Sequence, residues 1–147
     1  MKEIIGPRLL VPGSFEVDTK ECTDLIVMRA RDMRIGCLVR RPGFAERYGN
    51  EFTIRSHRKS GVETEASKVD KGWGDWMFYG HADPYKDGRV CLWMIIDLSN
   101  FRYHCHHHGS VLKFVERDNP DGITSFIAFD VTSFPPDPPL LIAHSNQ

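Results

Sequence analysis

The sequence predicts an α+β fold with a mixed, mostly antiparallel β-sheet of about six strands and few short helices. Apolar or alternating runs of strand length recur along the chain, turn sequences separate them, and helical periodicity is scarce. The 147 residues are 41% hydrophobic and 11% aromatic, which is enough for one core. We therefore expect a single domain over residues 1–147.

Each expected strand carries its own signal. Glu51–Arg55 alternates polar and apolar residues, as a half-buried strand does. Val90–Leu98 is the most hydrophobic segment and is expected at the centre of the sheet. Asp87-Gly88 predicts a hairpin between 76–82 and 90–98. The other expected strands are Leu25–Met28, Ile35–Val39, Trp76–Tyr79, Val111–Val115 and Phe126–Val131, the last two separated by the turn sequence Asn119-Pro120-Asp121-Gly122.

Helices and chain ends are less regular. Short helices are expected at Ser14–Lys20 and Glu63–Val69, and a further one begins at Leu98 and runs to His104. Residues 1–13 are expected to form an irregular arm, and residues 134–147 a proline-rich tail. Within that tail, Leu140–Ala143 is expected to return as an edge strand, which would offer a pairing edge for a homodimer.

No apolar run reaches the ~18 residues of a membrane span, and the N-terminus has no signal-peptide layout. The four cysteines form no CxxC pair and are expected to be free thiols in a reducing compartment. We therefore expect a cytoplasmic protein without a membrane partner.

The charge distribution gives the main functional signal. Residues 29–59 contain nine arginine or lysine residues against three acidic ones, whereas the whole chain has a net charge of −1. A basic block that is nearly all arginine favours a surface that binds polyanions. The residues expected to bind nucleic acid are Arg41, Arg55, Arg58, Lys59, Lys68 and Trp73. The alternative for the stretch from Arg55 to Lys68 is a solvated, salt-bridged surface loop.

The segment Gly72-Trp73-Gly74-Asp75-Trp76 has two interpretations. The glycines allow close approach of a ligand and the tryptophans offer stacking faces, with Asp75 as an acceptor or metal ligand. Alternatively, the segment is a β-turn before a strand, with a tryptophan in the core and Asp75 capping the turn.

Two sets of residues are candidate metal ligands. Carboxylates at Glu21, Asp24 and Asp75 suit Mg²⁺ or Mn²⁺, although carboxylates near strand ends also occur for structural reasons. The alternative set, in the run from Tyr103 to Gly109, is His104, His106 and His108. Zinc is disfavoured there, because neighbouring residues of a strand point to opposite faces and no second ligand pair follows at zinc-finger spacing.

The arrangement from Glu16 to Arg55 resembles the opening of the PD-(D/E)XK nuclease fold. In that fold a helix bearing a carboxylate precedes a strand with an aspartate and a strand with an acidic-x-Lys motif. The resemblance implies Glu16 or Glu21 as the first carboxylate and Asp24 as the second. Gly36–Arg40 departs from the family pattern, since Arg40 stands where the lysine is expected and the acidic residue is missing. The implied catalytic set is then Asp24, Asp75 and Arg40.

The chain also resembles small uncharacterised proteins of bacteriophages and integrated mobile elements. This resemblance rests on Glu51–Arg55, Gly72–Trp76 and Trp93–Leu98. Two functions follow as hypotheses. The first is nucleic-acid binding on a nuclease-like scaffold, with metal-dependent phosphodiester cleavage left open. The second is a non-enzymatic interaction protein that binds a host protein.

Overall fold

The computed structural model describes residues 10–12, 25–27 and 33–145. The chain divides into two compact units, Met1–Met33 and Arg34–Gln147. In the first unit, β1 (Leu10–Pro12) pairs antiparallel with β2 (Leu25–Val27). A strand therefore lies within the segment 1–13 that we expected to be irregular. The helix predicted at 14–20, together with the candidate ligands Glu21 and Asp24, lies outside the described residues.

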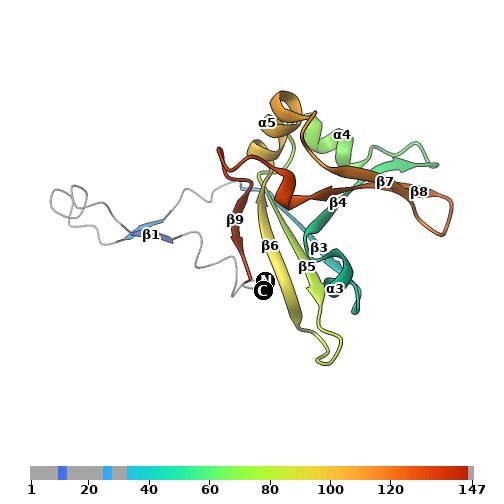
Figure 1. Ribbon diagram of the computed structural model, residues 1–147, viewed down its shortest axis with the longest axis horizontal. Helices are drawn as coiled ribbons and strands as arrows, with labels where there is room; N and C mark the ends of the chain where they lie inside the picture. Colours follow the sequence, from blue (N-terminus) through green and yellow to red (C-terminus); the bar gives the residue numbers. More distant parts are fainter. Residues whose placement is uncertain (1–9, 13–24, 28–32, 146–147) are drawn as a thin grey trace. The chain divides into compact units, whose positions relative to one another are not determined.

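The second unit contains two sheets and few helices, so the predicted α+β class is confirmed (Figure 1). The first sheet has the order β3-β5-β6-β9 and the second has the order β4-β8-β7. The strands of the first sheet are β3 (Ile35–Arg40), β5 (Trp76–Ala82), β6 (Val90–Asp97) and β9 (Leu141–His144). Those of the second are β4 (Glu51–Arg58), β7 (Phe114–Asp118) and β8 (Thr124–Asp130). The helices are α3 (Ala45–Tyr48), α4 (Glu65–Asp70), α5 (Leu98–His108) and the 3₁₀ turn η2 (Val131–Ser133).

The main departure from the predicted fold is the division of the strands between two sheets. Among the described strands only β3 and β5 pair in parallel, and β4, which lies between them in sequence, joins β8 instead. This division buries apolar side chains of both sheets against each other, with Ile54 of β4 and Met77 of β5 in the same core cluster. A single sheet would leave one of these faces in water.

Several local predictions are confirmed. Strands β5 and β6 form the antiparallel hairpin expected around Asp87-Gly88, and Gly88 has a φ of 72°. Strand β9 pairs with β6 at the edge of the first sheet, as expected for Leu140–Ala143. The first residue of β7 is Phe114 rather than Val111, because residues 109–113 instead form the connection from α5.

An aromatic cluster joins the second sheet to helix α5. The ring of Phe52 lies 5.4 Å from that of Phe129 and 5.5 Å from that of Phe101. Phe134, in the segment after η2, lies 6.2 Å from Phe52. Helix α5 is fixed over this cluster at its N-terminus, where the Asp97 carboxylate accepts hydrogen bonds from the amides of Ser99 and Asn100 at 2.8 and 2.9 Å.

The parallel pairing of β3 with β5 positions the residues of the candidate site. Its register places Ile35 beside Trp76 and Arg40 beside His81. Because both strands run the same way, Arg40 and His81 share one end of the sheet, and Arg34 and Asp75 share the other. No helix in the described part of the chain is long and apolar enough to cross a membrane.

The segment from Gly72 to Trp76 forms the turn that leads into β5. Gly72 and Gly74 have φ values of 86° and 80°, which favour glycine, and a Cβ on Gly74 would lie 2.9 Å from a methyl group of Leu98. Trp76 is buried, whereas Trp73 is 58% exposed. The geometry matches the structural interpretation of this motif, with one tryptophan in the core.

Candidate anion-binding groove

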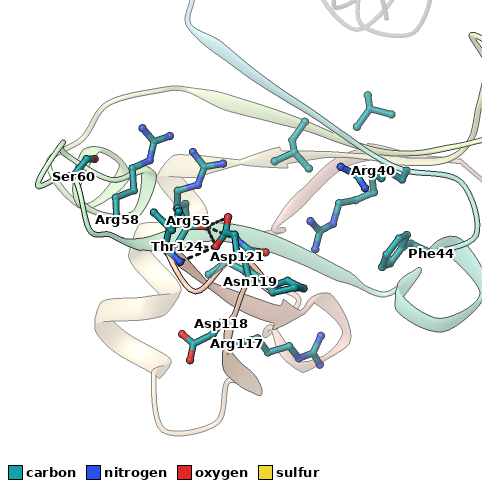
Figure 2. A pocket seen from close by; sticks show the side chains of 16 residues that line it. Arg40, Phe44, Arg55, Arg58, Ser60, Arg117, Asp118, Asn119, Asp121 and Thr124 are labelled. Atoms are coloured by element: carbon teal, nitrogen blue, oxygen red, sulfur yellow. Dashed lines mark hydrogen bonds between the residues drawn. The ribbon is translucent and has the colours of Figure 1, made fainter.

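A groove with a volume of about 950 Å³ lies between the end of β3 and the hairpin of β7 and β8 (Figure 2). One side comes from residues 38–41 and Phe44, and the other from the end of β4 and the turn after β7. Five arginines line it: Arg40, Arg41, Arg55, Arg58 and Arg117. We call this feature the arginine groove.

The second sheet builds one wall of the groove by strand register. Phe126 on β8 lies opposite Arg55 on β4 and opposite Arg117 on β7. Because side chains directly opposite each other share a face of the sheet, the three form a row that faces the groove. The alternate residues of β8 and β4, such as Ile127 and Ile54, belong to the core on the other face.

Arg40 connects this wall to the first sheet. Its guanidinium lies over the ring of Phe126 at 5.3 Å and over the ring of Phe44 at 5.9 Å. Such contacts hold an arginine side chain in place without neutralising its charge. The groove therefore presents Arg40 on an aromatic support.

Only part of the positive charge in the groove is neutralised. Arg117 forms a bidentate pair with Glu51 at 2.9 and 3.2 Å, and Arg55 lies 3.8 Å from Glu65. Arg40, Arg41 and Arg58 form no ion pair with a carboxylate in the described part of the chain. Three guanidinium groups of the groove therefore keep a positive charge that no carboxylate among the described residues neutralises.

The two carboxylates that line the groove serve the hairpin turn. Asp121 accepts hydrogen bonds from the amides of Ile123 and Thr124 at 2.8 and 3.2 Å, and the bond from Ile123 is the main cause that lowers the pKa of Asp121. Asp118 accepts a 2.6 Å bond from the hydroxyl of Ser125. These bonds fix the carboxylates in the turn. Asp121 lies beside Arg55 in the groove (Figure 2), and the charge of Arg55 also contributes to the lowered pKa of Asp121.

A buried polar cluster lies beside Arg40. The hydroxyl of Tyr79 lies 3.3 Å from that of Thr53. Burial raises the pKa of Tyr79, and the hydrogen bond with Thr53 and the charge of Arg40 oppose that rise. His81 is 1% exposed, and its ring nitrogens have no hydrogen-bond partner in the described residues. Burial, and secondarily the charge of Arg40, lowers the pKa of His81.

This environment predicts that His81 makes the protein sensitive to acid. Below its unfolded-state pKa of about 6.5, the unfolded chain binds a proton that folded His81 resists, so stability falls as the pH falls. Between pH 7.5 and pH 5.5 the free energy of unfolding of the native protein should fall by up to about 1.4 kcal/mol more than that of the His81→Leu variant. Urea unfolding of both proteins at both pH values measures this difference. Equal losses in the two proteins would show that His81 titrates normally.

The groove unites four of the basic residues predicted from the sequence: Arg40, Arg41, Arg55 and Arg58. Lys59, Lys68 and Trp73 are not among the residues that line it. The Lys59 amide donates to the carbonyl of Ile123 at 3.0 Å, which ties β4 to the hairpin. Trp73 follows α4, and its amide donates to the carbonyl of Lys68 in that helix. The Trp73 ring lies 5.5 Å from the Arg34 guanidinium.

Asp75 and Arg40 lie at opposite ends of the parallel strand pair. The register separates these ends by six residues, or about 20 Å, since a strand rises ~3.3 Å per residue. The Asp75 carboxylate accepts a 2.7 Å bond from the Arg34 amide and lies 3.6 Å from the Arg34 Nε. Asp75 therefore fixes the start of β3 to β5, and the structure does not bring it together with Arg40. No cluster of three metal-ligating side chains occurs among the described residues.

The histidine run lies on helix α5, so our strand-based argument about its geometry was wrong. On a helix, His104 and His108 share a face and His106 points away from them. His104 is buried and its Nε2 donates to the Pro138 carbonyl at 2.7 Å. His106 lies 3.8 Å from Asp70. The three side chains therefore do not converge on one point.

Sequence reasoning missed the other residues of the groove, among them Phe44, Arg117 and Phe126. Arg117 and Phe126 lie opposite each other on β7 and β8. Arg117 stands between Glu116 and Asp118, and Phe126 stands in the run Phe126–Phe129, so no alternation in the sequence marks either residue as facing a groove. Phe44 precedes the short helix α3, which the sequence did not predict. Comparisons of this chain with protein-family models, with curated proteins and with solved structures found no match.

Proposed function

We propose that this protein binds nucleic acid through the phosphate backbone, in the arginine groove. One observation carries the proposal. Arg40, Arg41 and Arg58 come from β3, the turn after it and the end of β4, yet they line one groove and have no carboxylate partner in the described residues. Guanidinium groups bind phosphate oxygens in bidentate fashion, which suits repeated phosphates along a strand.

The form of the groove supports a polymer as the ligand. Its basic residues are spread from the end of β3 to the end of β4 and to β7, rather than converging on a single point (Figure 2). The two groove carboxylates are held by hydrogen bonds within the turn, and in the described part of the chain neither forms an ion pair with Arg40, Arg41 or Arg58. A flexible polyanion can follow the arginines along the groove.

The first test is a salt series. Native protein is titrated into a fluorescein-labelled 20-nucleotide DNA, and polarisation is recorded from low to high NaCl in EDTA, so that binding is separated from any cleavage. With roughly three to five phosphate contacts, we expect a log Kd against log salt slope of about 2 to 4.

Two results would overturn the proposal. A slope near zero would mean that phosphates do not provide the affinity. Absence of binding even at low salt would exclude the groove as a nucleic-acid site and would favour the host-protein hypothesis instead.

A further inference from the structure

Exposed apolar side chains occur along the arginine groove as well as charges. Val39 is 52% exposed, Phe44 40% and Ile123 51%, and all three line the groove. They come from β3, the segment before α3 and the β7–β8 turn. A surface that only attracted phosphates would gain nothing from these side chains, which prefer an apolar partner.

The arrangement around Arg40 provides a stacking surface. Its guanidinium lies over the rings of Phe44 and Phe126, so flat groups already contact one another at this point. Phe44 also stacks on Tyr48 of α3, with ring centroids 5.9 Å apart. Bases of single strands stack on aromatic rings and on arginine planes in this way.

A duplex and a single strand would use this groove differently. In a duplex the bases are stacked inside the helix. The duplex backbone would therefore face Val39, Phe44 and Ile123, and these side chains would have no apolar partner. A single strand can turn its phosphates to Arg41 and Arg58 and its bases to the apolar side chains. The combination of charged and apolar groups therefore matches an unpaired strand.

We propose that the ligand of the arginine groove is single-stranded nucleic acid, whose bases contact Phe44, Val39 and Ile123. This inference rests on the proposed function, because it requires that the groove binds phosphates. It adds that affinity depends on exposed bases, which a salt series alone does not reveal.

The test compares three 20-nucleotide probes by polarisation: a mixed-sequence single strand, an abasic strand with the same phosphates, and a duplex. The native protein should bind the base-bearing strand about tenfold more tightly than either of the others. Phe44→Ala should reduce this preference severalfold, and its effect on the abasic strand, through the contact with Arg40, should be smaller than its effect on the base-bearing strand. Tyr85→Ala, an aromatic truncation at a 91% exposed residue that does not line the groove, is the matched control and should behave as the native protein.

The outcomes separate this inference from the proposed function. Equal affinity for the base-bearing and abasic strands, or tighter duplex binding, would overturn the single-strand inference and leave phosphate binding intact. Failure to bind any probe would overturn both. Because Phe44→Ala also removes the contact with Tyr48, Ile123→Ala is measured as a second variant. If both variants keep the native preference for the base-bearing strand, the proposed contact of bases with Phe44 and Ile123 is overturned.

Discussion

Replacing Arg40, Arg41 and Arg58 together with glutamine is expected to weaken nucleic-acid binding at least about a hundredfold. Each charge-assisted hydrogen bond contributes roughly 1.5–3 kcal/mol, and these three guanidinium groups have no competing carboxylate in the described residues. The salt dependence should change as well. Loss of three phosphate contacts lowers the slope of log Kd against log salt by about 2 for a single strand.

A matched control is needed because the variant also lowers the net charge by three. Lys86, Arg89 and Lys113 are exposed and do not line the groove, so their replacement with glutamine changes the charge equally. We expect less than about a threefold loss of affinity in this control, since charges more than a Debye length of ~10 Å away are largely screened at 0.1 M salt. Equal losses in the two triple variants would show that binding follows the overall charge rather than the groove.

Arg40 also contacts two aromatic rings, so its replacement can disturb packing. The double variant Arg41→Gln with Arg58→Gln keeps those contacts and isolates the effect of charge. It should retain the thermal midpoint of the native protein and still lose affinity. A double variant that binds as tightly as the native protein would limit the role of the groove to Arg40.

The sequence predicted the strands better than their arrangement. Local signals such as the alternation of Glu51–Arg55 and the turn at Asp87-Gly88 depend on neighbouring residues only. The structure confirms both, as β4 and as the β5–β6 hairpin. The separation into two sheets depends instead on which apolar faces meet. That choice pairs β4 with β8, which lies far along the chain, and no local pattern encodes it.

The candidate site was predictable only in part for the same reason. The arginine-rich block identified Arg40, Arg41, Arg55 and Arg58, because clustered charge is visible in a linear sequence. Arg117 enters the groove only through the pairing of β7 with β8. Asp75 has the residue type that a metal site requires, but its carboxylate is engaged by the Arg34 amide at the other end of β5.

Truncating Phe52 to alanine is expected to lower the free energy of unfolding by about 3–5 kcal/mol, the usual cost of removing a buried phenylalanine. Phe52 is fully buried, and its ring contacts Phe101 of α5, Phe129 of β8 and Phe134 after η2. The cavity left by the truncation would therefore remove packing contacts with three elements at once. Urea unfolding followed by tryptophan fluorescence measures the loss.

Phe114→Ala is the matched control for this truncation, because Phe114 also lies beside Phe129, at 5.7 Å, yet is 55% exposed. Its cost should be below about 1.5 kcal/mol, since water already covers much of the ring. Domains are stable by only about 5–15 kcal/mol, so Phe52→Ala can be largely unfolded at 25 °C. Phe52→Leu keeps most of the volume and should remain measurable at a cost below about 2 kcal/mol. Equal costs for Phe52→Ala and Phe114→Ala would contradict the aromatic cluster as the centre of the core and, with it, the wall that holds Arg55 and Phe126 in the groove.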